Sequence, residues 1–178
     1  MDIEQNDLSG TIPPGLVNLS GLEVLSLAGN RITGTIPSGV GDLSNLRDLK
    51  LHMNQLSGPI PPGLGRLRRL ARLSLCCNAF TGPIPPELGN LSSVEFLGLQ
   101  VNELSGSVPS ELGRLSALRH LYLFTNADLR GPLPQELVNL RLTTFNWILT
   151  GLCSPPNAEF QNWLRSIPRY DGGGVCSE

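Results

Sequence analysis

Residues 46–67 read LRDLKLHMNQLSGPIPPGLGRL, and residues 70–91 repeat the pattern as LARLSLCCNAFTGPIPPELGNL. The two stretches are offset by 24 residues and share leucines, an asparagine, a glycine and prolines at equal positions. The asparagine recurs through most of the chain, at Asn6, Asn30, Asn54, Asn78, Asn102 and Asn126. A fixed period of about 20 to 50 residues is typical of a solenoid, in which each repeat forms one structural unit. The period therefore predicts the fold class.

Each repeat predicts one short strand followed by a turn. The Leu-x-Leu step of residues 49–51 alternates apolar and variable residues, as a strand with one buried face does. The glycine and proline that follow, as at Gly58 and Pro61, favour a turn and exclude a long helix. One repeat cannot enclose its own leucines, whereas stacked repeats can. Two further columns are expected inside the stack: Leu16, Val40, Leu64, Leu88 and Leu112, and Leu19, Leu43, Leu67, Leu91 and Leu115.

Over residues 1–152 the sequence resembles leucine-rich repeat proteins of the plant-specific class, whose repeat reads Leu-x-x-Leu-x-Leu-x-x-Asn-x-Leu-Ser/Thr-Gly-x-Ile-Pro. The resemblance implies an α/β solenoid, a right-handed superhelix of about seven coils with one parallel β-sheet on its concave face. It also implies that side-chain amides join the coils by bonding their backbones, since an amide both donates and accepts. The residues in this role are Asn30, Asn54, Asn78, Asn102 and Asn126.

Both ends of the chain depart from the repeat. Residues 153–178 are predicted to form a C-terminal cap, with a helix that starts at Ser154 and ends before Pro168. Its apolar face would comprise Phe160, Trp163, Leu164 and Ile167, at helical spacing. An amphipathic membrane helix is the less favoured alternative, because only two basic residues accompany that face. At the other end, Ile3 falls in a strand column with no cap or leader before it, so a trimmed chain, a truncated product and a short family member all stay open.

The four cysteines fall into two pairs. Cys153 and Cys176 flank the predicted helix and are expected to form a disulfide, which would imply an oxidising compartment. Cys76 and Cys77 are adjacent and are interpreted as small, partly buried thiols. Stacking would bring them beside His52 and Met53, and these four residue types are ligands that soft metals prefer. No local ligand spacing supports that set, so we predict neither a metal site nor a cofactor.

Several functional classes lack a signal. The net charge of −2 does not favour nucleic acid, and no apolar run reaches the length of a membrane span. No catalytic motif is present, and His52 and His120 lie about three coils apart, so we predict that the protein is not an enzyme. Two Asn-x-Ser triplets, at Asn18 and Asn90, would permit glycosylation, although the repeat itself favours Asn-Leu-Ser at this position.

The solvent side of the predicted sheet carries the variable residues. Its candidate ligand-binding residues are Phe96, His120, Tyr122, Phe124, Arg72 and His52. Gly98 is expected to leave a gap beside Tyr122, and two exposed ion pairs are expected, Asp48 with Arg72 and Glu95 with Arg119. Exposed aromatic side chains on a rigid sheet are typical interface anchors.

These features predict a non-catalytic recognition module that binds a protein or peptide through its concave face. By resemblance, repeats of this class form ectodomains of plant-type receptor kinases and secreted inhibitors of pectin-degrading enzymes. The alternative is a structural or scaffold repeat protein, trimmed or engineered, with no dedicated ligand. A monomer is expected. An extracellular location is favoured, and a cytoplasmic one stays open because the chain carries no signal peptide.

Overall fold

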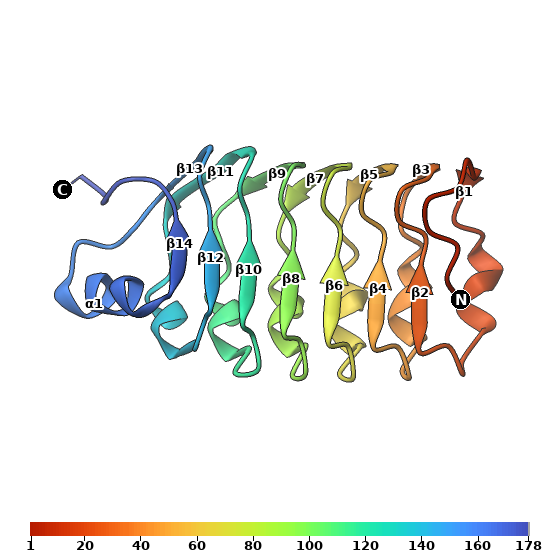
Figure 1. Ribbon diagram of the computed structural model, residues 1–178, viewed down its shortest axis with the longest axis horizontal. Helices are drawn as coiled ribbons and strands as arrows, with labels where there is room; N and C mark the ends of the chain where they lie inside the picture. Colours follow the sequence, from red (N-terminus) through yellow and green to blue (C-terminus); the bar gives the residue numbers. More distant parts are fainter. Residues whose placement is uncertain (178) are drawn as a thin grey trace.

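The computed structural model describes residues 1–177, which form an elongated stack of coils (Figure 1). The second to seventh coils contribute one strand each, and the C-terminal segment one more, to a seven-stranded parallel sheet, here called the front sheet. Its strands are β2 (Val24–Ser26), β4 (Asp48–Lys50), β6 (Arg72–Ser74), β8 (Phe96–Gly98), β10 (His120–Tyr122), β12 (Thr144–Asn146) and β14 (Arg169–Asp171). Leu49 lies beside Leu25 on one side and Leu73 on the other, so the sheet register follows the 24-residue period. The prediction of a solenoid with one parallel sheet strand per coil is confirmed.

A second row of parallel strands, here called the side strands, was not anticipated from the sequence. They are β1 (Ser9–Thr11), β3 (Arg31–Gly34), β5 (Gln55–Pro59), β7 (Ala79–Pro83), β9 (Glu103–Gly106), β11 (Asn126–Pro132) and β13 (Thr150–Cys153). Gly58 has a φ of 74°, which glycine adopts without the steric penalty of a Cβ. In the sequence alone, this glycine indicates a turn. Neighbouring coils bend at the same place, so their backbones stay paired through the bend.

Short 3-10 helices cover the side of the stack behind the front sheet (Figure 1). They are η1 (Pro14–Asn18), η2 (Ser38–Asp42), η3 (Pro62–Arg66), η4 (Pro86–Asn90), η5 (Ser110–Arg114) and η6 (Gln135–Asn139). Each follows a proline in extended conformation, such as Pro61 before η3. Adjacent helices pack closely: a Cβ added at Gly65 would lie 2.2 Å from the carbonyl oxygen of Glu87. The expectation of short turns rather than long helices on this side therefore holds.

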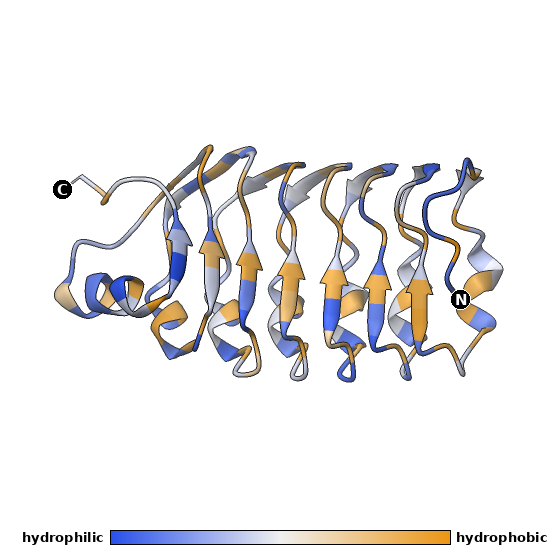
Figure 2. Ribbon diagram, in the orientation of Figure 1, coloured by the Kyte–Doolittle hydropathy of each residue, from blue (hydrophilic) through white to orange (hydrophobic). Residues whose placement is uncertain are grey.

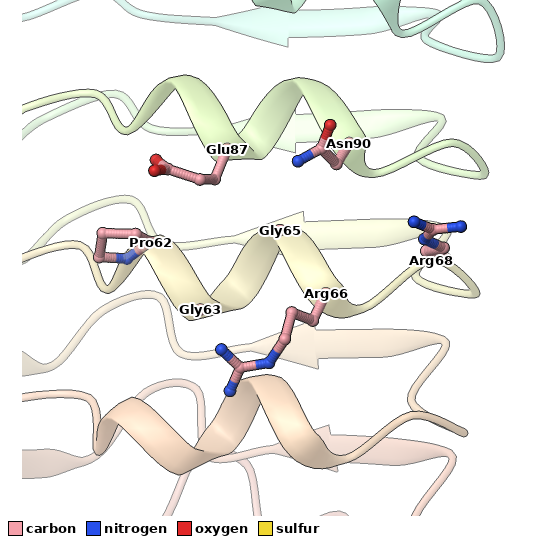
Figure 3. A pocket seen from close by; sticks show the side chains of 7 residues that line it. All are labelled: Pro62, Gly63, Gly65, Arg66, Arg68, Glu87 and Asn90. Carbon is pink, nitrogen blue, oxygen red and sulfur yellow. The ribbon is translucent and has the colours of Figure 1, made fainter.

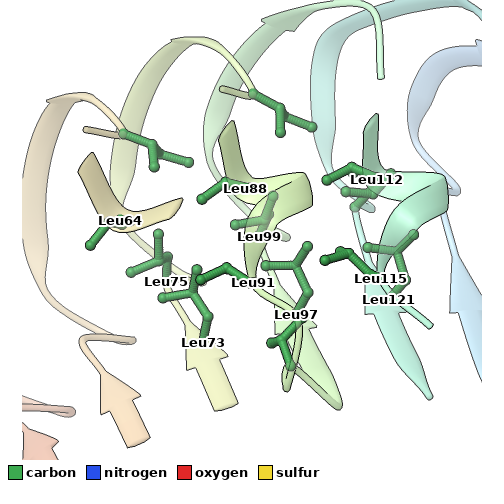
Figure 4. Close-up of a cluster of buried hydrophobic side chains, with 14 of the residues drawn as sticks. Leu64, Leu73, Leu75, Leu88, Leu91, Leu97, Leu99, Leu112, Leu115 and Leu121 are labelled. Atoms are coloured by element: carbon green, nitrogen blue, oxygen red, sulfur yellow. The ribbon is translucent and has the colours of Figure 1, made fainter. Parts of the chain in front are cut away.

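The core is a continuous column of leucines between the front sheet and the 3-10 helices (Figure 4). The side chains of Leu73, Leu97 and Leu121 are fully buried. In Figure 2, hydrophobic and hydrophilic segments alternate at similar places from coil to coil, as the repeat requires. The first coil is the exception. Leu19 was expected inside the stack but is 49% exposed, because no coil of the described chain packs on its outer side.

The first coil also pairs more weakly with its neighbour than the sequence predicts. Ile3 was expected within a strand, yet the front-sheet pairing of this coil is one isolated bridge between Asp2 and Ser26. The backbone N–H of Ile3 donates to the carbonyl of Ser26 at 3.0 Å.

The C-terminal segment covers the last coil with helix α1 (Ala158–Ser166). The prediction that Ser154 starts this helix is wrong: Asn157 is the N-cap, and its side chain accepts a hydrogen bond from the backbone N–H of Phe160 at 2.9 Å. Phe160 and Leu164 are buried as expected. Trp163 is half-buried and donates its indole N–H to the carbonyl of Leu140 at 2.9 Å, which fixes the helix on the stack.

The predicted disulfide between Cys153 and Cys176 is present. Between these cysteines the chain forms α1 and then β14, which pairs with β12 and completes the front sheet. The segment assigned to the cap therefore also supplies a sheet strand. The division into a solenoid of residues 1–152 and a cap of residues 153–178 stays a prediction.

Candidate ligand-binding face

Asparagine side chains join the coils behind the front sheet; those of Asn30 and Asn126 are buried and the others are half-buried. The Nδ2 of Asn78 donates to the carbonyl of Leu51 on the preceding coil, at 3.0 Å, and to two carbonyls of its own turn. Its Oδ1 accepts from the backbone N–H of Leu56 at 3.0 Å. The same pattern occurs at Asn30, Asn54, Asn102 and Asn126. These bonds hold the backbone of successive coils in fixed register, so side chains on the front sheet have a rigid support.

Four ring-bearing side chains form a contiguous group on the solvent side of the front sheet. This aromatic cluster consists of Phe96 on β8, His120 and Tyr122 on β10, and Phe124 just after β10. The ring centroid of Phe96 is 5.4 Å from that of Tyr122 and 6.2 Å from that of His120. Tyr122 meets Phe124 edge-on at 6.4 Å. All four are half-buried, so the rings support one another and keep part of their surface open.

The Phe96 ring occupies the place where a gap was expected. A Cβ added at Gly98 would lie 2.9 Å from Cε1 of Phe96, so the ring folds over the glycine. The prediction of an open gap beside Tyr122 is therefore wrong. The guanidinium of Arg72 lies on the Phe96 ring, with its central carbon 4.6 Å from the ring centroid. This distance is that of a cation–π contact.

A polar patch adjoins the aromatic cluster on the N-terminal side. It consists of Glu4, Asp48, Lys50, His52, Arg72 and Ser74, which line a hollow of about 390 Å³. The Nζ of Lys50 is 3.2 Å from Oε1 of Glu4, and the Nε of Arg72 is 3.8 Å from Oδ1 of Asp48. The Nδ1 of His52 lies 3.2 Å from the hydroxyl of Ser74. The candidate residues Arg72 and His52 thus belong to this patch.

Hydrogen bonds and burial shift two titratable groups of the polar patch. Hydrogen bonds from Ser26 and Lys50 lower the pKa of Glu4, while partial burial lowers the pKa of His52. Sequence reasoning missed Glu4 because the residue lies in the atypical first coil, 46 positions before Lys50. Glu4 lies two residues before Asn6, as His52 lies two residues before Asn54. This equivalent position in the repeat could have placed Glu4 on the same face.

The remaining candidates of the sequence do not form a site. Cys76 is buried, and burial raises the pKa of its thiol to about 12. Among residues 1–177 no three His, Cys, Asp or Glu side chains come together as metal ligands. The expected pair of Glu95 and Arg119 is also absent from this described range. Arg119 instead donates to the backbone carbonyls of Ser116 and Leu118.

The family model described as Leucine Rich Repeat matches residues 21–43, 45–67 and 69–91. The chain is a leucine-rich repeat solenoid. Among curated protein sequences, none gives a significant match.

Solved structures of plant proteins share the fold of this leucine-rich repeat protein. One is the ectodomain of the membrane receptor kinase GASSHO1/SCHENGEN3 from Arabidopsis thaliana, in complex with CASPARIAN STRIP INTEGRITY FACTOR 2. It has 40% identity and a TM-score of 0.85 over 90% of this chain. A second is the Arabidopsis receptor kinase HAESA with the peptide hormone IDA and the co-receptor SERK1, at 29% identity and a TM-score of 0.88 over 98% of this chain. A third is a plant ice-binding protein, at 26% identity and a TM-score of 0.84 over 98% of this chain.

The chain spans only part of the length of these neighbours. It spans 19% of the first receptor chain, 30% of the second and 57% of the ice-binding protein. The family model describes repeats, and the first of these structures is a receptor ectodomain, so the matches indicate no catalytic domain. Over the described residues, no helix combines the length and apolarity that crossing a bilayer requires.

Proposed function

We propose that this leucine-rich repeat protein binds a protein or an extended peptide on its front sheet, without catalysis. The aromatic cluster is the main contact and the polar patch the second. The protein acts as a monomer, in the extracellular space. The observation that carries this proposal is the aromatic cluster itself, a contiguous set of half-open rings on a rigid parallel sheet.

The cluster does not serve the core. The core at this level is built by residues that point inward from the same strands, such as Leu97 and Leu121, which are fully buried. Large aromatic side chains contribute much of the binding energy of protein interfaces, because they bury a large area with little loss of conformational freedom. Here the rings also hold one another in place, so less freedom remains to be lost on binding.

The polar patch gives the face a second kind of contact. Arg72 touches both Asp48 and Phe96, which makes the polar patch and the aromatic cluster one continuous surface. Together they extend over the front sheet from the first coil to β10 and the residues that follow it. This arrangement suits a ligand that lies along the sheet with an apolar group at the C-terminal end and a polar group at the N-terminal end.

The compared structures support a peptide as the ligand but do not identify which peptide it is. GASSHO1/SCHENGEN3 and HAESA were crystallised with CASPARIAN STRIP INTEGRITY FACTOR 2 and with the peptide hormone IDA, respectively. The plant ice-binding protein has the same fold, so the fold alone does not choose the ligand. The choice of a peptide rests on the chemistry of the front sheet.

Peptide selection followed by alanine substitution tests the proposal. A displayed library of random linear peptides would be selected on the immobilised protein, and the affinity of the enriched peptides measured. Tyr122→Ala and Phe124→Ala are each expected to weaken binding at least about tenfold, which corresponds to about 1.4 kcal/mol. Tyr170→Ala is the control for the loss of a partly exposed ring outside the aromatic cluster, since this tyrosine lies on β14 and stacks on Trp147 at the end of the stack.

Two results would contradict the proposal. If no peptide is enriched above an unrelated protein, the scaffold alternative stands. If peptides bind but Tyr122→Ala and Phe124→Ala both leave the affinity unchanged, the aromatic cluster is not the site. The charged residues from Arg47 to Arg72 would then be tested next.

A further inference from the structure

Two asparagines hold equivalent places on the side of the stack that carries the 3-10 helices. Asn18 is the last residue of η1, and Asn90 is the last residue of η4, three coils further along. Each begins an Asn-Leu-Ser triplet, completed by Ser20 and Ser92. Both asparagines are exposed. The triplet is the acceptor sequence for N-linked glycosylation in the secretory pathway.

The side chains of these asparagines are free, unlike those that join the coils. Within residues 1–177 the amide groups of Asn18 and Asn90 make no hydrogen bond, whereas the amide of Asn78 makes four. A sugar attached to the Nδ2 of Asn78 would break the contact between coils. A sugar on Asn18 or Asn90 would break nothing. We propose that Asn18 and Asn90 carry N-linked glycans.

The surface around Asn90 has room for the first sugar. Asn90 borders a hollow of about 560 Å³ between η3 and η4, shown in Figure 3. Gly63 and Gly65 form part of its wall and contribute no side chains. Arg68 and Glu87 border the same hollow and offer a donor and an acceptor to sugar hydroxyls. Arg66 extends instead towards η2, where its Nη2 lies 2.7 Å from Oδ1 of Asp42.

The surface around Asn18 is also open. It borders a shallow hollow of about 420 Å³ formed by residues 18–22. Both sites lie on the 3-10 helices, behind the front sheet (Figure 1). The glycans therefore leave the aromatic cluster and the polar patch uncovered. This inference rests on the proposed extracellular location and not on the proposed ligand.

A third asparagine at the end of a 3-10 helix can test whether the Asn-x-Ser triplet decides which asparagines are glycosylated. Asn139 is the last residue of η6 and is exposed, but its triplet ends in Arg141 and so has no hydroxyl. Arg141 is also exposed, so a serine there should not disturb the fold. The substitution Arg141→Ser creates a third acceptor triplet at the end of a 3-10 helix, where the backbone is extended at Leu140 instead of turned as at Leu19 and Leu91.

The experiment is secretion of the chain from an insect cell line behind a cleavable leader, followed by intact mass measurement. Two glycans are expected, and release by an N-glycosidase should convert Asn18 and Asn90 to aspartate. Ser20→Ala and Ser92→Ala should each remove one glycan, and Arg141→Ser should add one. Ser44→Ala is the control, because Ser44 follows Asp42 at the equivalent position and completes no triplet.

A secreted chain with the unmodified mass would overturn the proposal, and occupancy at one asparagine only would overturn it for the other. Peptide affinity measured before and after glycan release should be the same. A change in that affinity would contradict the placement of the glycans away from the front sheet, whatever ligand is found.

Discussion

The guanidinium carbon of Arg72 lies 4.6 Å from the centroid of the Phe96 ring, on the neighbouring strand of the front sheet. The same side chain places its Nε 3.8 Å from the carboxylate of Asp48, on the strand before. One arginine thus joins three consecutive coils on the solvent side. The side chain is about half exposed, so neither contact is strong by itself.

A double-mutant cycle should detect the contact between Arg72 and Phe96. The coupling between Arg72→Ala and Phe96→Leu is expected to be about 0.5–1 kcal/mol in the free energy of unfolding, as for a cation–π contact at an exposed site. Urea denaturation of the four proteins measures it. The same cycle with Arg47→Ala should give no coupling, because Arg47 pairs with Glu23 instead. Equal couplings for the two arginines would contradict the assignment.

Leu121→Ala should lower the free energy of unfolding by about 2–5 kcal/mol, because it opens a cavity in the stacked core. Leu121 has no exposed surface. Leu149→Ala is the control: this leucine is 71% exposed, and the change should stay within about 0.5 kcal/mol. A similar loss at both positions, measured by urea denaturation, would show that position in the coil does not determine burial.

Asn78→Ala should cost about 2 kcal/mol or more. The substitution leaves the N–H of Leu56 without its partner, and an unpaired buried polar group is costly; the carbonyl of Leu51 loses one of its two side-chain donors and keeps Asn54. Asn6→Ala is a matched control from the same column of the repeat. Asn6 is exposed and donates only to carbonyls of its own turn, so its loss should cost less than about 1 kcal/mol. Amide hydrogen exchange at Leu56 would locate the effect.

Reduction of the Cys153–Cys176 disulfide should lower the free energy of unfolding by about 3 kcal/mol on the chain-entropy account, given the separation of 23 residues. Thiol titration of the denatured, unreduced protein should find two free thiols, those of Cys76 and Cys77. Four free thiols would contradict the structure at this end. Exchange protection should fall first in α1 and β14, which lie between the bonded cysteines.

His52 should make the protein less stable as the pH falls. Burial lowers the pKa of His52 below its ordinary value of 6.5, helped by Lys50 and Arg72 and opposed by Glu4. In the interval between the two pKa values the unfolded chain binds more protons, so stability rises with pH there. The contribution is fully present above about pH 6.5 and is lost as the pH falls towards the folded pKa. His52→Gln should flatten the urea midpoint between about pH 7.5 and 5.5, and an unchanged slope would contradict the burial.

The sequence predicted the features that depend on the 24-residue period, namely which positions are buried and which asparagines join the coils. The position of a leucine or an asparagine within its coil follows from the repeat and does not depend on side-chain rotamers. Leu49 could therefore be placed in the core, and Asn54 between the coils, without a structure. The side strands escaped prediction because Gly58 and Pro59 read as turn residues, while their pairing depends on the next coil bending at the same point. The start of α1 was misplaced because Ser154 and Asn157 are both good N-caps, and only the path of the chain after Cys153 selects between them.

The sequence predicted which residues belong to the candidate site better than it predicted how their side chains are oriented. Phe96, Tyr122 and Phe124 lie together because strand register brings their positions together. The rotamer that turns Phe96 over Gly98 and under Arg72 depends on contacts between coils, which no single repeat contains. Glu4 joined the polar patch for a similar reason, since its partner Lys50 lies two coils away along the stack.

The close packing at Gly65 has a geometric consequence for the whole body. Equivalent glycines at Gly41, Gly89 and Gly113 also leave no room for a Cβ against the next 3-10 helix. These glycines let the backbones of neighbouring 3-10 helices come into direct contact, which keeps the coils closely spaced at the back of the stack. Each coil contacts mainly its two neighbours, so the body is a row of equivalent units (Figure 1). Duplicating or deleting one coil would change its length and leave the curvature of the remaining coils unaltered, so repeat number can vary without reshaping the surface that is already there.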